Sequence, residues 1–423
     1  MPATFQDWTR GRTVPSLGTN TGADDLPFQN WRHFKEAFTP ELVARAVARS
    51  DIQVTSCLDP FGGSGTTAVA CQFLGIHPII AEVNPFLADL IEAKLSIYDS
   101  DALARDLGVV LRTAGNDGLK DDDLFAAMPQ TFIEPGVGGR WIFDREAADR
   151  IASLLTAIES LPTIRHKRLF RVLLGGILVE VSNVVVNGKG RRYRRNWERR
   201  RRDNRQVDEL FCDSARRAIS EIHRFSDRKK TTFELLRGDS REVLTEIETC
   251  DLAVFSPPYP NSFDYTDVYN VELWMLGYLK GSECNRALRI STLCSHVQIS
   301  RNFLPAPLES SILTTTLEQL VARRSELWDR RIPEMVGGYF ADLIAVLDRI
   351  FRVLTPGGST LMVVGDSRYA GIQIATAEII SEIAQGRGWK LCGIEPFRSM
   401  RASAQQGGRR ELAESLIILS KEA

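Results

Sequence analysis

The chain has 423 residues, 43% hydrophobic and 25% charged, so it is long enough for two or three domains and has the composition of an ordinary folded protein. Its net charge of −1 excludes a basic molecule overall, so any nucleic-acid surface must be local. The seven cysteines include no CxxC pair, and no stretch resembles a signal peptide or a membrane span. We therefore expect a cytoplasmic α/β protein with reduced thiols, no zinc site and no membrane partner.

The first residues are expected to precede the folded core. Residues 1–27 are polar and rich in glycine, threonine and aspartate, which predicts an irregular N-terminal arm. Phe38-Thr39-Pro40 then has the form of a helix start, with Thr39 as the cap and Pro40 at the first helical position. Apolar residues at helical spacing follow this start, and a helix cap alone would account for it.

A strand, a glycine-rich turn and an amphipathic helix are predicted over residues 52–74, which together form the first half of a βαβ unit. The turn reads Asp59-Pro60-Phe61-Gly62-Gly63-Ser64-Gly65-Thr66-Thr67, and its glycines let a ligand approach the backbone because they carry no Cβ. No lysine follows the glycines, and their spacing differs from the Walker and dinucleotide patterns. A nucleoside-bearing ligand without phosphates therefore fits this turn better than a triphosphate.

A second strand, residues 77–83, carries Glu82 near its end, about 20 residues beyond the glycines. An acidic side chain at the tip of the second strand can accept both hydroxyls of a ribose. A solvated charge is the alternative, but the preceding glycine turn favours the ribose contact. Asn84-Pro85 then begins a helix that is expected to run through Lys94.

The alternation of strands and helices stops between residues 96 and 230, where helical periodicity predicts a mainly α-helical insert. Residues 186–205 within it contain ten basic and two acidic residues. Such a run is often only a solvated helix face, but the planar donor fork of arginine suits phosphate groups. We predict that nucleic-acid contacts come from Arg191, Arg192, Tyr193, Arg194, Arg195, Trp197, Arg199 and Arg200.

The sheet is expected to resume at residues 233–237, followed by Asp239, which either accepts from an adenine amino group or belongs to a turn. The next apolar strand, residues 252–255, stops at Ser256-Pro257-Pro258-Tyr259. Two prolines end sheet pairing and stiffen the backbone, which predicts a rigid lip where open α/β sheets bind ligands. A hydroxyl, an aromatic ring and proline carbonyls suit a planar base that carries an exocyclic amine.

The rest of the chain is expected to complete the sheet. The aromatic segment 263–279 either lines a base pocket or belongs to the core, and residues 280–335 form a second insert with a helix around 321–331. The final portion predicts an antiparallel hairpin at the edge of a mostly parallel sheet. Its expected elements are a helix over 337–354, a strand over 360–364, a helix over 375–386, and strands over 389–396 and 416–419.

These motifs resemble those of the amino-group DNA methyltransferases that use S-adenosylmethionine. The turn from Asp59 to Thr67 is similar to their cofactor loop. Ser256-Pro257-Pro258-Tyr259 is similar to their catalytic motif in the serine form associated with N4-cytosine methylation, and Phe38-Thr39-Pro40 resembles the motif that packs against the methionine part of the cofactor. The resemblance implies a doubly wound, Rossmann-like sheet that is mostly parallel, with an antiparallel edge hairpin and a mainly α-helical insert.

The resemblance covers residues 30–95 and 233–279 well and 340–421 loosely. It implies a catalytic domain made of residues 28–95, 231–279 and 336–423, interrupted by a basic candidate DNA-binding insert (96–230) and a candidate target-recognition insert (280–335). The implied catalytic residues are Ser256, Pro257, Pro258 and Tyr259, and no metal is implied. The implied contacts to S-adenosyl-L-methionine are Phe38, Thr39, Asp59, Phe61, Gly62, Gly63, Gly65, Thr66, Glu82, Asn84, Asp239 and Ser256.

The function implied by the resemblance is methyl transfer to the exocyclic amine of a flipped base in a specific sequence of double-stranded DNA, with N4 of cytosine favoured by the serine motif. The cofactor loop precedes the catalytic motif, as in the adenine-type order, so N6-adenine methylation is the alternative. A related enzyme acting on RNA or on a protein glutamine amide, and a non-catalytic binding module, also remain open. A cognate restriction nuclease acting on the same sequence is a partner that this family allows.

Overall fold

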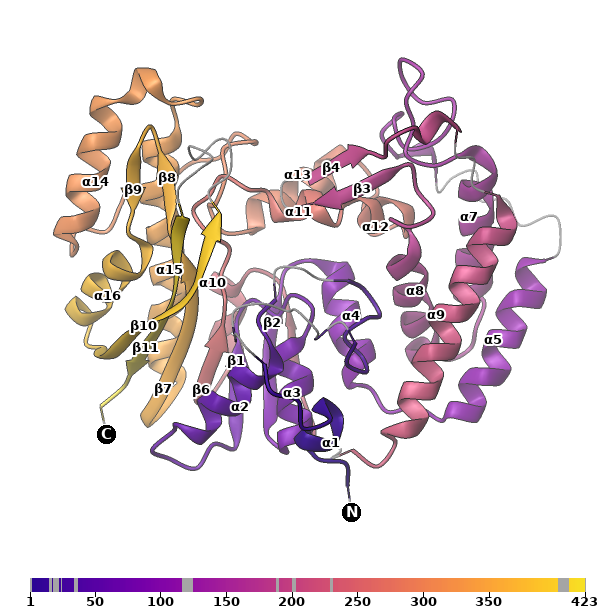
Figure 1. The fold of residues 1–423 in the computed structure, drawn as a ribbon, viewed down its shortest axis with the longest axis horizontal. Coiled ribbons are helices and arrows are strands. Elements are labelled where there is room, and N and C mark those ends of the chain that lie inside the picture. The colour runs from indigo at the N-terminus through magenta and orange to yellow at the C-terminus, as the bar shows by residue number, and fades with distance from the viewer. Residues whose placement is uncertain are drawn as a thin grey trace.

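The computed structural model describes residues 2–14, 17, 23, 25–33, 37–115, 125–187, 190–199, 203–228, 231–401 and 411–422. A seven-stranded sheet with the order β10-β11-β7-β6-β1-β2-β5 runs through its centre (Figure 1). The strands of this sheet are β1 (Ser56–Asp59), β2 (His77–Glu82), β5 (Glu234–Arg237), β6 (Cys250–Phe255), β7 (Leu354–Gly365), β10 (Lys390–Arg401) and β11 (Glu411–Ser420).

Five neighbouring strands, β7, β6, β1, β2 and β5, pair in parallel, whereas β11 is antiparallel to both β7 and β10. The register of β11 on β7 places Leu416 beside Val363 and Ile417 beside Met362. The fold is therefore a Rossmann-like α/β fold, and the predicted mostly parallel sheet with an antiparallel edge hairpin is confirmed.

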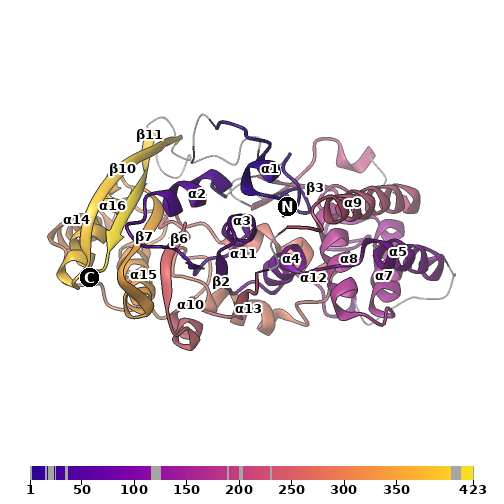
Figure 2. The same cartoon turned by 90° about the horizontal axis from the view of Figure 1, so that it is seen from below.

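The sheet separates two hydrophobic cores, since alternate side chains of a strand point to opposite faces. In β6, Leu252 and Val254 belong to one core, and Ala253 and Phe255 belong to the other. This double burial explains why the strands appear in the sequence as continuous apolar runs. Figure 2 shows helices on both faces. The helices of the first core are α2 (Pro40–Ala48), α3 (Thr66–Leu74) and α4 (Pro85–Leu95), and those of the second are α10 (Ser240–Val243), α15 (Ile332–Val353) and α16 (Thr376–Gly386).

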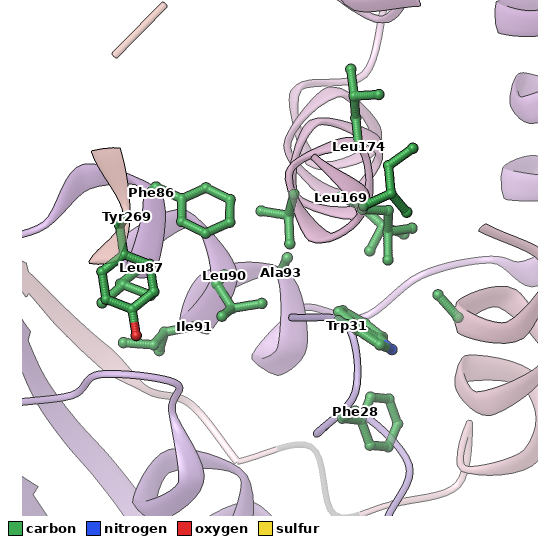
Figure 3. Packing of buried hydrophobic residues seen from close by; sticks show 14 of the residues in the cluster. Phe28, Trp31, Phe86, Leu87, Leu90, Ile91, Ala93, Leu169, Leu174 and Tyr269 are labelled. Atoms are coloured by element: carbon green, nitrogen blue, oxygen red, sulfur yellow. The ribbon is translucent and has the colours of Figure 1, made fainter. Parts of the chain in front are cut away.

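The first insert forms a helical layer beside α4 (Figure 1). Helix α8 packs against α4 (Figure 3), and the insert shares the first core of the sheet. Gly175 permits this approach, because a Cβ there would lie 2.5 Å from Cε2 of Phe86. The elements of the insert are α5 (Ser100–Ala114), α7 (Arg145–Glu159), α8 (Ile164–Ile177), the hairpin β3 (Val184–Asn187) and β4 (Gly190–Tyr193), η1 (Trp197–Arg199) and α9 (Asn204–Arg224).

The expectation of a wholly irregular N-terminal arm is wrong, because Phe5–Thr9 forms helix α1. Thr4 and Asp7 form a reciprocal capping box at its start. Trp8 is fully buried, stacks on Phe73 with ring centroids 4.8 Å apart, and donates its indole N–H to the carbonyl of Pro27 at 2.9 Å. This part of the arm is therefore a component of the first core.

The prediction of a helix around residues 321–331 is also wrong. Helix α14 (Ser311–Ala322) ends at the start of this range, and a short 3₁₀ turn, η3 (Arg324–Glu326), follows. The arginines here stabilise irregular backbone: Arg331 pairs with Asp329 at 2.7 Å and also donates to the carbonyl of Val297. The remaining elements are α11 (Tyr265–Val268), α12 (Asn270–Met275), α13 (Ser282–Ser291), η2 (Leu244–Glu246), β8 (Ser367–Tyr369) and β9 (Ile372–Ile374).

Within the described residues, no helix combines the length and the hydrophobicity needed to cross a membrane. The same residues contain no cluster of three histidine, cysteine or acidic side chains that would hold a metal ion.

Candidate active site

A cavity of about 410 Å³ opens where β1, β2, β5 and β6 end at their carboxyl termini. Residues from several distant parts of the chain line it, so the fold brings the glycine turn, the tip of β2 and the proline lip into one compartment. The predicted site residues in its lining are Phe38, Asp59, Phe61, Gly62, Gly63, Thr66, Glu82, Asn84, Asp239, Ser256, Pro257, Pro258 and Tyr259.

Two predicted contacts, Thr39 and Gly65, lie beside the cavity and are not part of its lining. Thr39 occupies the cap position of α2, with Pro40 in the first turn as predicted, but its buried hydroxyl makes no capping hydrogen bond. Gly65 precedes α3 with a φ of 79°, a conformation that favours glycine. Both residues therefore shape the backbone around the cavity.

The glycine turn is held against β2 by backbone contacts. The amide of Gly62 donates to the carbonyl of Ala81 at 3.0 Å, and a Cβ on Gly62 would lie only 2.4 Å from Cγ2 of Ile80. The Glu82 carboxylate accepts the amide of Gly63 at 2.7 Å and the amide of Asn84 at 2.8 Å. Glu82 therefore fixes the turn, and with about four lone-pair sites its carboxylate can still accept a further hydrogen bond.

Two buried carboxylates dominate the electrostatics of this part of the cavity. Burial raises the pKa of Glu82 to about 7, with a smaller contribution from the nearby charge of Asp59. Burial also raises the pKa of Asp59 to about 6, partly offset by hydrogen bonds from Thr67 and the amide of Phe61. Both groups therefore change protonation within about one pH unit of neutrality, where a hydroxyl-bearing or cationic ligand would favour their ionised forms.

Asp239 lines the cavity, but its carboxylate already has a strong partner. It caps α10 by accepting the amide of Arg241 at 2.9 Å, and it also accepts Nε of the same arginine at 2.9 Å. Nη1 of Arg241 pairs with Asp342 at 2.7 Å. The structure thus gives Asp239 the turn role that the sequence allowed, at the wall of the cavity.

A chain of hydrogen bonds fixes the proline lip. Ser256 donates its hydroxyl to the carbonyl of Val363 at 3.1 Å and lies 3.3 Å from the hydroxyl of Tyr259. Tyr259 donates to Oε1 of Glu414 at 2.6 Å, and Oε2 of Glu414 lies 2.5 Å from Nε of Arg398. Because the Ser256 proton is engaged with the carbonyl, the lone pairs of Oγ are available to accept a ligand N–H.

Glu414 and Arg398 are site residues that the sequence analysis did not find. Glu414 is only 2% exposed, and burial raises its pKa. The predicted strand covered residues 416–419, whereas β11 begins at Glu411. The period-two pattern Leu412, Glu414, Leu416 would have placed this acidic residue on a buried face of the strand, because all three side chains are buried.

The aromatic segment after the lip supplies both wall and core. Phe263, Tyr265 and Tyr269 line the cavity, whereas Leu273 and Trp274 pack in the first hydrophobic core. Residues Ser291, Thr292, Leu293 and Ser295 of the second insert also line the cavity, although no motif marks them in the sequence. Only long-range packing brings these residues to the lip.

In the described residues from 186 to 199, the basic stretch forms the β3–β4 hairpin and a 3₁₀ turn, so a solvated helix face is wrong for this part, and α9 begins only at Asn204. Arg191 lies 5.3 Å from the ring centre of Phe132 and is partly buried, Arg194 donates to the carbonyls of Ser182 and Val179, and Trp197 is buried. These three residues hold the hairpin. Tyr193 is half-buried beside Trp197. The side chains of Arg192, Arg195 and Arg199 are exposed, and Arg200 lies outside the described residues.

No protein-family model matches the chain. The chain is 25% identical to the Type II methyltransferase M.AvaI of Nostoc sp., a similarity that covers 93% of this chain and 86% of that protein. It is 24% identical to the Type II methyltransferase M.BsoBI of Geobacillus stearothermophilus, over 93% of this chain and 85% of that protein. A shorter similarity, 38% identity over 72 residues, relates 17% of the chain to 14% of the Type II methyltransferase M.MjaII of Methanocaldococcus jannaschii.

Among solved structures, the rRNA methyltransferase aviRa of Streptomyces viridochromogenes covers 91% of this chain and 85% of its own, with a TM-score of 0.31 and 10% identity. At this identity and TM-score, the likeness says nothing about the function of the chain. The sequence similarity to two Type II methyltransferases over nearly the whole chain supports a methyltransferase, and with it a methyl donor of the S-adenosylmethionine type.

Proposed function

We propose that the protein transfers the methyl group of S-adenosyl-L-methionine to the exocyclic amine of a base extruded from a specific sequence in double-stranded DNA, with N4 of cytosine as the target. The observation that carries this proposal is the single cavity shared by the glycine turn, Glu82 and the lip from Ser256 to Tyr259. One compartment thus combines a nucleoside-binding turn with acceptors suited to a base amine. The Type II designation of the relatives supports a DNA substrate and a role beside a restriction nuclease of the same specificity.

The residues on the nucleoside side fit the cofactor. Gly62 lets the turn pack closely on Ile80 and Ile91, which keeps its backbone in the cavity wall, and the Glu82 carboxylate, with about four lone-pair sites, can still accept from a ribose hydroxyl. Phe38 lines the same cavity and provides an apolar surface for the methionine part. When bound, the cofactor supplies an electrophilic methyl group on a sulfonium.

The lip supplies the acceptors for the amine. An exocyclic base amine is a poor nucleophile because its lone pair is delocalised into the ring. Ser256 Oγ accepts one N–H, since its own proton is donated to Val363, and the Pro257 carbonyl accepts the other. These contacts direct the nitrogen lone pair out of the ring plane, so that positioning and electrostatics lower the barrier without a strong base. The new N–C bond would replace the sulfonium S–C bond, leaving S-adenosylhomocysteine, and the amine nitrogen would lose its extra proton to solvent.

Tyr259 provides the stacking surface for the base. Its hydroxyl is held by Glu414, so the ring is fixed before the base arrives and its ordering entropy is not lost during binding. Extruding the base from the duplex costs about a few kcal/mol, which stacking and hydrogen bonds in the cavity offset. We expect Phe263 and Tyr265, which line the same cavity, to add to this surface.

The two inserts are proposed to hold the DNA. Exposed Arg195 and Arg199 beside the β3–β4 hairpin suit phosphate contacts from the 96–230 insert. Four residues of the 280–335 insert line the cavity together with the proline lip, which supports a role for that insert in target recognition: Ser291, Thr292, Leu293 and Ser295.

The experiment that tests the function is nucleoside mass spectrometry after incubation of the protein with S-adenosylmethionine and unmethylated genomic DNA, with total RNA in parallel. N4-methylcytosine in DNA is expected. N6-methyladenine in DNA would show that the order of the motifs predicts the target base better than Ser256 does. Methylated nucleosides found only in RNA would show that RNA is the substrate, and the absence of methylated nucleosides from both would contradict the proposal.

Ser256→Ala tests the mechanism within this function. Removing one preorganised hydrogen-bonding group from an active site costs about a hundredfold or more in turnover, and we expect a loss of this size. Calorimetric affinity for the cofactor should stay the same, because Glu82 and the glycine turn are untouched. An unchanged turnover number would remove Ser256 from the reaction.

A further inference from the structure

A second cavity, of about 450 Å³, lies beside the first and is lined by an unusual set of charges. Three arginines, Arg241, Arg286 and Arg301, face it together with one carboxylate, Asp342. Arg286 belongs to α13, and Arg301 lies in the 280–335 insert that follows it.

The carboxylate of this cavity is already used. Asp342 accepts Nη1 of Arg241 at 2.7 Å and the amide of Cys294 at 2.9 Å. Arg241 also pairs with Asp239 through its Nε at 2.9 Å, so two carboxylates neutralise its charge. Little negative charge is left for the other two arginines.

Arg301 is held without a carboxylate partner in the described part of the chain. Its Nη1 and Nη2 donate to the carbonyls of Thr292 and Arg289, at 3.0 and 2.5 Å, while its buried Nε has no hydrogen-bond partner. Arg286 is exposed at the cavity and makes no ion pair with any described residue. Arg301 and Arg286 therefore both face the cavity without an ion-pair partner among the residues that the structure describes.

A guanidinium keeps its charge in proteins, so partial burial of Arg301 with only carbonyls as hydrogen-bond acceptors is costly, and an anion would offset that cost. Burial lowers the pKa of Arg301, consistent with this incomplete compensation. The donor fork of arginine matches the oxygens of a phosphate, to which two arginines can bind at once.

The same strip of chain separates the two cavities. Ser291, Thr292, Leu293 and Ser295 line the first cavity, whereas Cys294 lines the second. We propose that the second cavity binds a phosphate group through Arg286 and Arg301, and that this group is a phosphodiester of the substrate DNA near the extruded nucleotide. The DNA source rests on the proposed function; the phosphate site itself does not.

The test compares Arg286→Ala with the wild type and with Arg352→Ala. Arg352 is an equally exposed arginine in the last turn of α15, about 15 Å along the helix from Asp342, and serves as the matched control. Equilibrium binding of a duplex is measured over a range of salt concentrations, and binding of inorganic phosphate is measured by calorimetry. Loss of one phosphate contact should lower the slope of log affinity against log salt by about one in Arg286→Ala only.

The two measurements separate the sources of the phosphate. A lower slope in Arg286→Ala, restored towards wild type in Arg286→Lys, supports a DNA phosphodiester. Phosphate binding that Arg286→Ala weakens, together with an unchanged DNA slope, supports a site for a free phosphate instead. Unchanged values for both ligands in Arg286→Ala would overturn the site. Cofactor affinity and methyl transfer, measured in the same proteins, test the proposed function separately.

Discussion

If Glu82 binds the ribose of the cofactor as proposed, cofactor binding should depend on pH in a way that can be calculated. Burial raises the pKa of Glu82 to about 7 in the free protein, and its carboxylate accepts the amides of Gly63 and Asn84 at the wall of the cavity. Ribose hydroxyls donate hydrogen bonds, so the ionised form is the better acceptor and binding should favour it. The sign follows: affinity rises as the pH increases through about 7, because less free energy is then spent on removing the proton.

The magnitude follows from the same pKa. If only the ionised form binds, affinity at about pH 6 should be about tenfold weaker than at about pH 8, a difference of about 1.4 kcal/mol. In Glu82→Gln this dependence should disappear, and affinity should be lower throughout because an amide cannot accept through its nitrogen. Asp59, with a pKa of about 6, accounts for any dependence that remains at the acidic end.

Isothermal titration calorimetry with S-adenosylhomocysteine at a series of pH values measures this effect. Titration of the ligand's own groups is common to both proteins, so the difference between the two curves isolates Glu82. Parallel curves for the wild type and Glu82→Gln would refute the assignment of Glu82 to the cofactor.

Three further outcomes test the site and its support. Gly62→Ala should lower the free energy of unfolding by about 1–3 kcal/mol and, by displacing the turn, weaken cofactor binding, since its Cβ would meet Cγ2 of Ile80 at 2.4 Å; a normal free energy of unfolding together with normal calorimetric affinity would contradict the close packing of the turn on β2. Glu414→Ala should reduce turnover about tenfold or more with cofactor affinity retained, because Tyr259 loses a charge-assisted hydrogen bond of about 1.5–3 kcal/mol. Glu414→Gln still accepts from Tyr259, so its turnover should lie between those of the wild type and Glu414→Ala. Equal turnover in all three proteins would show that the hydrogen bond to Tyr259 is dispensable. Trp8→Ala should cost about 3–5 kcal/mol of unfolding free energy in denaturant titrations, and a loss below about 1 kcal/mol would show that the N-terminal helix is only loosely attached to the core.

The parts of the fold that the sequence predicted are those set by local patterns. Strands buried on both faces appear as apolar runs, and glycines or paired prolines mark where they end, so the turn from Asp59 to Thr67 and the lip at Ser256 were visible without a structure. The sequence also indicated that the turn and the lip lie close together, because the carboxyl ends of parallel strands share one edge of a sheet, and both line the same cavity.

What the sequence did not predict depends on distant partners. Tyr259 and Glu414 are 155 positions apart, and only the pairing of β11 with β7 brings them together. The run of arginines was ambiguous for a related reason: composition gives charge, but whether Arg191 faces solvent or Phe132 is decided by the hairpin that packs it. Trp8 likewise looked like part of a polar arm, because its partner Phe73 belongs to another element.

The position of β11 has a consequence for the order in which the protein matures during synthesis. This strand is the last of the sheet in the sequence, yet it lies between β7 and β10 and carries Glu414 to the lip. A nascent chain that already contains the glycine turn, Glu82 and the proline lip therefore still lacks the group that anchors Tyr259. Ribosome-bound chains should acquire a fixed lip only after β11 has been inserted into the sheet.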